Sequence, residues 1–372
     1  MIDSTFSGLL EMDSRRGGHL RRLSIELDRQ PSDPYVSPSM ITRFVLRNAC
    51  FLQCTTKRGE GGKPEVGVIK TINGLEPDEW KYVEDFARRT AVDPSDRIRL
   101  TSIPSAVSMR VVDLLCPLGK GQRALIVAPP RSGKTVLMQQ FAASIAANHP
   151  EIKLMVLLVD ERPEEVTDMS RTIKGEVFAS SSDSDRDSHV RIAQLVLDYA
   201  KRYVETGKDV VLLLDSLTKM GRAFNAVQRS SGRTLSGGVD IRALEIPKRI
   251  FGSARALEGA GSLTIVATAL VDTNSRMDEL IFQEFKGTGN MELVLDRDLS
   301  NERIYPAINI PESGTRREEL LFGNETGKYH ALRRVLNRMK PKEAMLTLQK
   351  AIQQYPTNEK LLDHLAKGLG AG

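Results

Sequence analysis

Five continuous apolar runs of strand length constrain the fold of this chain more than any other feature. They lie at residues 124–128, 153–160, 209–216, 262–270 and 291–296. Runs of Leu, Ile and Val without polar alternation predict strands that are buried on both faces, as in a parallel sheet. Amphipathic stretches of helical length lie between them, which gives repeated strand–helix–strand units and predicts an α/β fold.

The rest of the chain differs in texture from these units. Residues 1–75 hold short β-rich runs separated by Gly and Pro clusters such as "RQPSDPYVSP", which predict a small barrel or sandwich. Residues 76–103 are expected to form a linker with one short helix. Residues 104–330 carry the α/β core, and residues 331–372 predict two short helices packed against it.

Composition sets only wide limits on function. The 372 residues include 53 Lys and Arg against 48 Asp and Glu, a formal charge of +5, which allows a polyanionic partner but fits a solvated surface equally well. Cys50, Cys54 and Cys116 lack zinc-site spacing and are expected to be ordinary thiols in a reducing cytosol. No stretch approaches the roughly 20 apolar residues that span a bilayer, so we expect a cytoplasmic protein.

The stretch "ALIVAPPRSGKTVLMQQF" joins a predicted strand to a predicted helix through a tight turn. A phosphate-binding loop needs this context, because backbone N–H groups at the helix start cradle phosphate oxygens. Gly133 lets the backbone approach, Lys134 reaches the β- and γ-phosphates, and Thr135 supplies a hydroxyl to Mg²⁺. The usual pattern opens with Gly where this chain has Ala128, and a chance turn before a helix is the alternative interpretation.

Two acidic strand ends extend this hypothesis. Asp215 follows an apolar strand, where a Walker B carboxylate would hold Mg²⁺ through water, although an Asp at a strand end is common. Asp160, Glu161 and Arg162 end a neighbouring run, where a carboxylate can orient the attacking water. The alternative role for these acids is an N-terminal cap for the helix that starts at Pro163.

Three further segments suggest contacts with a neighbouring subunit or with nucleic acid. Arg316 and Arg317 precede a helix, where an arginine can stabilise the γ-phosphate of a neighbouring subunit, or can form surface salt bridges with the next two glutamates. The Gly-rich segments 229–240 and 284–292 each carry a basic residue. Such loops can grip nucleic-acid phosphates, or they can be mobile surface loops.

Together these residues make the chain similar to the Rho family of transcription termination factors, which are ring-shaped hexameric RNA-dependent ATPases. The resemblance covers about residues 104 to 325 and rests on "LIVAPPRSGKT", "VDERPEEVTDM", "LLLDSLTKMGRAFN", "LSGGVD", "ATALVDTNSRMDELIFQEFKGTGNMEL" and "RIYPAINIPESGTRREELL". It implies a RecA-like P-loop NTPase core that uses ATP and Mg²⁺, preceded by an OB-fold of the cold-shock type. In this family the phosphate loop also begins with Ala.

The resemblance implies catalytic roles at matching positions. Thr135 and Asp215 would hold Mg²⁺, and Glu161 would activate the attacking water. Lys134 would bind phosphate, and Arg162 would lie beside the γ-phosphate.

The resemblance also implies residues that act at the boundary between subunits. Arg316 matches the arginine finger that acts on the next subunit's ATP, Arg303 matches a second interface arginine, and Tyr305 matches an aromatic that stacks on adenine. Lys219 stands where the family usually has Arg, so the charge is kept but the forked geometry is lost. The nucleotide-binding set implied in this way is Pro129, Pro130, Arg131, Ser132, Gly133, Lys134, Thr135, Val136, Asp215, Arg303 and Tyr305.

Two segments, "LSGGVD" and "FKGTGN", resemble the loops that line the central pore of the ring, where backbone and 2′-OH contacts hold RNA. Lys286 is the cation expected to contact it. The RNA-binding residues implied for these loops are Arg233, Ser236, Gly237, Gly238, Lys286, Gly287, Thr288 and Gly289.

The N-terminal part resembles the family's RNA-binding OB-fold less fully. The stretch "YVSPSMITRFVLR" matches, but Gly17 and His19 stand where the family places two aromatics, and "GGKPEVGVIK" lacks the Glu and Tyr that hold cytosine. Because stacking supplies roughly 1–3 kcal/mol per base, we expect weaker and less cytosine-selective RNA loading. We expect no small helical domain ahead of it. Backbone contacts remain available to Tyr35, Arg21, Arg43 and Arg47.

The resemblance implies an ATP-driven translocase and helicase that moves along single-stranded RNA and terminates transcription. Its expected assembly is a homohexameric ring that hydrolyses ATP at subunit interfaces, with the RNA polymerase elongation complex as a partner and no membrane contact. One alternative is an RNA-independent rotary or secretion-type ATPase subunit on a related RecA-like core. Another is a non-enzymatic RNA-binding regulator, which the retained catalytic residues disfavour.

Overall fold

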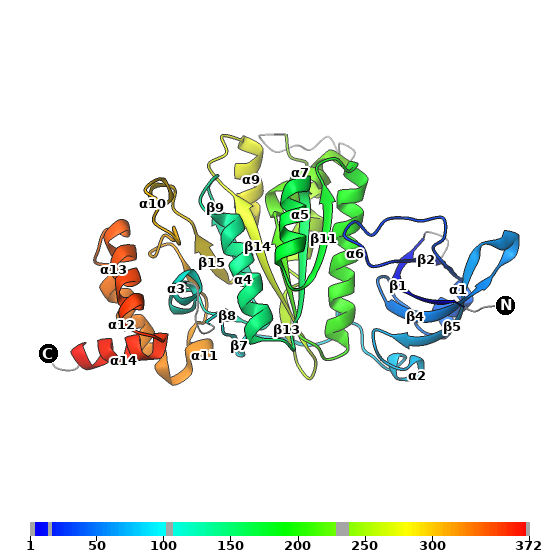
Figure 1. The fold of residues 1–372 in the computed structure, drawn as a ribbon, viewed down its shortest axis with the longest axis horizontal. Coiled ribbons are helices and arrows are strands. Elements are labelled where there is room, and N and C mark those ends of the chain that lie inside the picture. Colours follow the sequence, from blue (N-terminus) through cyan, green and yellow to red (C-terminus); the bar gives the residue numbers. More distant parts are fainter. Residues whose placement is uncertain (1–3, 14–16, 102–106, 228–237, 370–372) are drawn as a thin grey trace.

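The computed structural model describes residues 4–13, 17–101, 107–227 and 238–369. Three blocks follow one another along its length: a β-barrel, a central sheet with helices on both faces, and a group of C-terminal helices (Figure 1). The predicted α/β class, with a small β-barrel ahead of a mainly parallel sheet, is confirmed.

Five strands close the N-terminal barrel in the order β1–β2–β3–β5–β4. Their bounds are β1 (Thr5–Met12), β2 (Gly18–Arg21), β3 (Tyr35–Val36), β4 (Phe51–Arg58) and β5 (Pro64–Ile72). Buried side chains such as Leu10, Leu20 and Leu52 fill it. Two short helices, α1 (Pro38–Arg43) and α2 (Pro77–Trp80), accompany it, and α2 is all that forms of the helix predicted after residue 75.

The central sheet runs in the order β11–β10–β12–β14–β9–β15–β16, and every pair is parallel except β15 with β16. The five apolar runs predicted as strands all lie in this sheet, as β9 (Arg123–Ala128), β10 (Lys153–Glu161), β12 (Val210–Asp215), β14 (Ser262–Leu270) and β15 (Met291–Val294). The strands that the sequence did not reveal are β11 (Glu176–Ser181), β16 (Gly314–Thr315), β13 (Arg255–Leu257) and β6 (Ala91–Val92).

Residues between the barrel and the core are bonded to the core rather than free of it. Strand β6 pairs with β13, which itself pairs with the first two residues of the inner strand β14. A separate two-stranded pair joins β7 (Arg97–Ile98) to β8 (Leu118–Gly119). The segment expected to act as a linker therefore contributes strands on either side of residue 94.

Helices cover both faces of the sheet because its strands are apolar on both faces. Along β10, Val156 and Leu158 pack into one core, whereas Leu157 and Val159 pack into the other. The first core receives α3 (Val107–Leu115), α4 (Lys134–Asn148), α5 (Pro163–Thr172), α12 (Thr326–Leu336), α13 (Pro341–Gln354) and α14 (Asn358–Leu369). The second receives α6 (Arg186–Glu205), α7 (Leu217–Val227), α8 (Glu245–Phe251) and α9 (Arg276–Phe285).

Buried contacts join the barrel to the sheet. Leu27, in the segment after β2, is fully buried in the core formed with α6 and α7. The N–H of Ala179 donates to the Ile25 carbonyl at 2.8 Å, so this segment covers the edge strand β11. Glu11 on β1 pairs with Arg191 on α6 at 3.3 Å. The barrel is thus fixed against one edge of the sheet through both apolar and ionic contacts.

Among the residues that the structure describes, none of the helices combines the length and apolar character that a transmembrane segment requires.

Candidate nucleotide-binding site

The predicted phosphate loop lies between β9 and α4, as its strand–turn–helix pattern requires. Gly133, the N-cap of α4, has a φ of +88°, which a residue with a side chain rarely adopts. The Ser132 hydroxyl and N–H both donate to the Pro129 carbonyl, at 2.7 and 3.3 Å, and close the turn. The loop therefore brings the chain directly into the helix and leaves the first N–H groups of α4 available to an anion.

A pocket of about 540 Å³ opens over this loop. The Tyr305 ring forms one wall, since a Cβ placed on Gly133 would lie 3.2 Å from it. Tyr305 is 41% exposed, which leaves an aromatic surface open to a ligand. The pocket is lined by the predicted residues Pro129, Pro130, Arg131, Ser132, Gly133, Lys134, Thr135, Val136 and Tyr305, together with Ser108, Leu137, Gln140, Leu270, Leu295, Pro306 and Ala307.

Lys134 and Asp215 form the ionic centre of the site. The Lys134 ammonium lies 2.5 and 2.6 Å from the two Asp215 carboxylate oxygens. The Thr268 hydroxyl on β14 also donates to Asp215, at 2.7 Å. Burial opposes the charge on Lys134, but the carboxylates of Asp215 and Glu161 outweigh it and raise the pKa of this lysine. The lysine stays charged and can move from Asp215 to a bound phosphate.

Glu161, at the end of β10, is a buried carboxylate held by two lysines. Its Oε1 lies 2.8 Å from the Lys219 ammonium and 3.9 Å from that of Lys134. Lys219 also donates to the Asp160 carbonyl at 2.9 Å, which fixes its position. Burial and the negative charge of Asp215 raise the pKa of Glu161 to about 7, despite Lys134. A carboxylate with such a pKa is suited to accept a proton near neutral pH.

Asp160 and Glu161 do not cap helix α5, which was the alternative role for these acids. Helix α5 begins at Pro163 with Arg162 as its N-cap, so neither Asp160 nor Glu161 occupies the capping position. Arg162 is exposed beside the buried Glu161. Glu161 therefore points into the site for a reason other than helix capping.

The predicted interface arginines, Arg303 and Arg316, do not line the pocket of their own phosphate loop. Arg316 is exposed after the outermost strand β16, and it makes no ion pair among the described residues. The adjacent Arg317 pairs with Glu319 at 3.7 Å, as the surface alternative predicted, and also with Asp93, which that alternative did not include. Arg303 is exposed with a φ of +61°, two residues before Tyr305.

The predicted pore loops are described only in part. Arg233, Ser236 and Gly237 lie outside the described residues, whereas the Gly238 carbonyl accepts a hydrogen bond from Asn225 at 3.1 Å. The other loop, residues 286–289, starts at the end of α9 with Gly287 at a φ of +86°.

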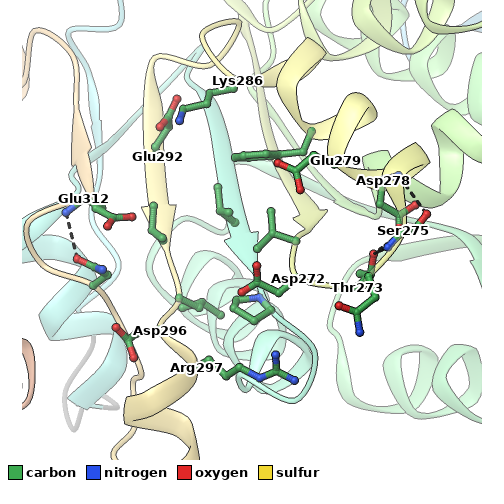
Figure 2. Close-up of a pocket in the computed structure, with 18 of the residues that line it drawn as sticks. Asp272, Thr273, Ser275, Asp278, Glu279, Lys286, Glu292, Asp296, Arg297 and Glu312 are labelled. Carbon is green, nitrogen blue, oxygen red and sulfur yellow. Dashed lines mark hydrogen bonds between the residues drawn. The ribbon is translucent and has the colours of Figure 1, made fainter. Parts of the chain in front are cut away.

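This second loop is bonded to the start of β9, at the opposite end of that strand from the phosphate loop. The Thr288 carbonyl accepts from Arg123, the first residue of β9, at 2.9 Å, whereas the phosphate loop follows the last residue of the same strand. Lys286 lines a pocket of about 850 Å³ between α9 and β15, whose lining includes Glu279 and Glu292 (Figure 2). The cation therefore lies in largely acidic surroundings within a single chain.

In the barrel, the predicted RNA-binding residues have different exposures. Tyr35 packs against His19, with ring centroids 5.4 Å apart, and a Cβ on Gly17 would lie 2.4 Å from the Tyr35 hydroxyl. Gly17 thus lets the tyrosine ring lie across β2. Arg21 is 8% exposed and pairs with Glu11 at 2.5 Å and Asp33 at 2.6 Å, so it is engaged within the barrel.

Arg43 is the last residue of α1, and Arg47 follows that helix by four residues. The Arg43 guanidinium lies 5.2 Å from the Phe44 ring centre. Arg47 stacks on Trp80 at 4.4 Å and pairs with Glu205 of α6 at 3.2 Å, so it joins the barrel to the core.

Sequence reasoning missed Thr268 as part of the ionic centre. It lies inside the apolar run "SLTIVATAL", and the only signal was a hydroxyl on a strand that neighbours the Asp215 strand. Lys219 was noted as a departure from the family, but its contact with Glu161 required the structure.

Comparison with known proteins shows which family this chain resembles in sequence. Residues 108–315 match the model of the ATP synthase alpha/beta family, nucleotide-binding domain. The chain is 47% identical to the transcription termination factor Rho of Streptomyces coelicolor over 98% of its own length and 87% of that protein. It is 46% identical to the Rho of Pseudomonas aeruginosa, with 97% and 87% covered.

Solved structures support the fold at lower identity. A type III secretion system ATPase of pathogenic bacteria superposes with a TM-score of 0.63 at 22% identity, covering 82% of this chain and 94% of that one. The ATP synthase subunit NeqB from Nanoarcheaum equitans gives 0.62 at 16% identity, covering 80% and 83%. These identities show a shared ATPase fold alone. On the sequence matches, the chain belongs to the transcription termination factor Rho family and carries its ATPase domain.

Proposed function

We propose that this chain is an RNA-dependent ATPase that terminates transcription as a ring of identical subunits, using ATP hydrolysis to move along single-stranded RNA. The carrying observation is the buried cluster of Lys134, Asp215 and Glu161 beside an open phosphate-loop pocket, in a chain 46–48% identical to proteins named transcription termination factor Rho. Binding of nucleotide follows from the ATPase domain; the use of RNA and the ring are the proposed steps.

ATP would enter with its phosphates on the loop and the start of α4. The Lys134 ammonium lies 2.5 Å from Asp215 and would swing from that carboxylate to the β- and γ-phosphates. A dianionic or trianionic phosphate competes well with one carboxylate for the lysine. The adenine would lie against the exposed ring of Tyr305.

The freed Asp215 carboxylate and the Thr135 hydroxyl offer the hard oxygen ligands that suit Mg²⁺, with water completing the shell. Both belong to the same corner of the site, since Thr135 follows Lys134 directly in α4. A bound Mg²⁺ would neutralise part of the phosphate charge.

Glu161 would accept the proton of the attacking water, and Lys219 would hold the carboxylate in place. Water attack at the γ-phosphorus breaks its bond to the bridging oxygen and gives ADP and phosphate. Charge develops on the γ-phosphoryl oxygens, where a cation lowers the barrier. Arg162, exposed beside Glu161, is proposed to contact these oxygens.

Arg316 is proposed to act on the nucleotide of the next subunit. It does not line the pocket of its own phosphate loop, and it is exposed beyond the outermost strand, where a neighbouring chain would meet it. Arg303 is proposed to help at the same boundary.

RNA is proposed to contact the segments 236–238 and 286–289 and the face of the barrel that carries Tyr35. Because Arg21 is engaged by two carboxylates, the barrel contact is proposed to depend on Tyr35 more than on Arg21. This supports the expectation of weak, poorly cytosine-selective loading.

The test is ATP hydrolysis by the purified chain with and without homopolymer RNAs. We expect strong stimulation by RNA, with poly(C) no better than other pyrimidine polymers. An ATPase that no RNA stimulates would overturn the proposal and favour the RNA-independent secretion or rotary class, whose members share the fold at 16–22% identity.

A further inference from the structure

A short segment after α10 (Arg297–Asn301) presents the aromatic wall of the nucleotide pocket. The Tyr305 ring is exposed, and its hydroxyl donates to the Ser300 carbonyl at 3.4 Å, a long hydrogen bond. The residue after it is Pro306, which has no backbone N–H with which to anchor the turn. The direction of the ring therefore depends strongly on what holds the Tyr305 backbone.

Helix α13 holds this segment at two points. The Gln349 side-chain amide donates from Nε2 to the Tyr305 carbonyl at 2.8 Å. About two turns earlier along the helix, the Lys342 ammonium forms an ion pair with Glu302. The two contacts lie on either side of Arg303. One helix therefore fixes the segment that carries two predicted site residues, Arg303 and Tyr305.

The helix itself is firmly seated, so its amide is a fixed donor. Met345 and Leu348 of α13 are buried in the core that also receives α3 and α4. The Ile352 carbonyl accepts from Arg110 of α3 at 2.8 Å. Helix α3 also contributes Ser108 to the lining of the nucleotide pocket. Helices α3 and α13 thus form a rigid backing behind the aromatic wall.

We infer that Gln349 is a positioning residue for the adenine base, and that α13 is part of the nucleotide site rather than packing alone. The inference rests on the proposed function, because it takes Tyr305 as the ring that contacts the base. Gln349 would act only through the Tyr305 backbone. Its loss should weaken recognition of the base and leave the phosphate loop unchanged, since it contacts neither Lys134 nor Gly133.

The experiment compares base recognition with phosphate recognition in three variants of the full chain with RNA present. Gln349→Glu keeps the size of the side chain but sets an acceptor against the Tyr305 carbonyl. Gln353→Glu makes the same chemical change one turn along α13, at an exposed position. Tyr305→Ala removes the ring. For each, the KM for ATP, kcat and the inhibition constant of inorganic tripolyphosphate, which lacks a base, are measured.

We expect Gln349→Glu to raise the KM for ATP roughly two- to tenfold, the usual effect of one hydrogen bond. The inhibition constant of tripolyphosphate and kcat should stay within about twofold of the parent, and Gln353→Glu should match the parent in all three. A KM unchanged in Gln349→Glu but raised in Tyr305→Ala would overturn the inference alone. Equal weakening of ATP and tripolyphosphate in Gln349→Glu would overturn it as well, by showing general damage to the site.

If Tyr305→Ala kept the KM of the parent, Tyr305 would not contact the base, and the inference about Gln349 would be wrong. RNA stimulation of hydrolysis would survive that result, so the failure would be separate from a failure of the proposed function.

Discussion

At the scale of single residues, the site depends on two carboxylates and two lysines that lie close together in a buried space. Asp215 and Glu161 are each 2% exposed, and two lysines compensate them. A buried carboxylate left without its partner cation is strongly destabilised, so the lysines hold these acids in position. Lys219 matters here because it is the nearer partner of Glu161.

Replacing Lys219 by Met should lower kcat for ATP hydrolysis by about 10- to 100-fold, the range expected for one charge-assisted hydrogen bond. The KM for ATP should change little, because Lys219 contacts Glu161 and the Asp160 carbonyl and does not line the pocket. Steady-state kinetics with saturating RNA would measure both. Lys219→Arg keeps the charge and should retain most of the rate.

Lys201→Met is the matched control, since Lys201 forms an ion pair with Asp198 on the far helix α6. A kcat for Lys219→Met equal to that of this control would show that Glu161 needs no lysine at this place.

The phosphate loop and both acids could be predicted from sequence because each lies at a strand end with a recognisable neighbour. Thr268 could not, because a hydroxyl within an apolar strand has no pattern that distinguishes a bond to Asp215 from simple burial. Arg21 shows the same limit in the barrel: its residue type suggests a phosphate contact, whereas Glu11 and Asp33 already occupy it.

At the scale of elements, long apolar strands were predictable and short polar ones were not. Strands β9, β10, β12 and β14 are buried along nearly their whole length and read as largely apolar runs, whereas β15 alternates buried with half-buried residues. The missed β11, "EVFASS", begins with a charged residue and ends in two serines, because it lies at the edge of the sheet and is covered in part by the Ile25 segment. Its strand neighbour β10 directly precedes it in the chain, so what the sequence lacks is a long apolar run rather than a nearby partner.

The junction between barrel and sheet carries a prediction at this scale. Glu11 on β1 is bound by Arg21 at 2.5 Å, by Arg29 at 2.7 Å and by Arg191 of α6 at 3.3 Å. Burial alone would raise the pKa of Glu11, but the hydrogen bonds from Arg29 and Arg21 and the charge of Arg191 lower it to about 2. A carboxyl with a depressed pKa stabilises the fold above its unfolded pKa of about 4.5.

Glu11→Gln should therefore lower the free energy of unfolding by up to about 3 kcal/mol at pH 7, and the deficit should shrink as pH falls from about 4.5 towards 2. Urea unfolding at pH 7 and pH 3 would measure it. Glu84→Gln changes an exposed carboxylate and should have little effect at either pH. A deficit that is the same at both pH values would mean that Glu11 acts through packing rather than charge.

At the scale of the whole molecule, the barrel, the sheet and the C-terminal helices form a row, with the barrel against the β11 edge and β16 at the other edge (Figure 1). The phosphate loop follows β9, two strands in from the β16 edge, and Arg316 follows β16 itself. A single chain therefore carries an open pocket and an exposed arginine that does not line it and that has no ion-pair partner within the described part of the chain. In a head-to-tail ring, each arginine would meet the next subunit's pocket.

Mixing two inactive variants tests this arrangement. Lys134→Ala removes the phosphate contact, Arg316→Ala removes the arginine, and each alone should abolish most ATP hydrolysis. If Arg316 acts across the boundary, an equal random mixture contains about one seam in four where an intact Lys134 faces an intact Arg316. Partial activity should then return when the two are mixed before assembly, measured as RNA-stimulated phosphate release. Double-variant subunits added to either one give no intact seam and serve as the control, and a mixture as inactive as its parts would place the arginine on its own subunit's nucleotide.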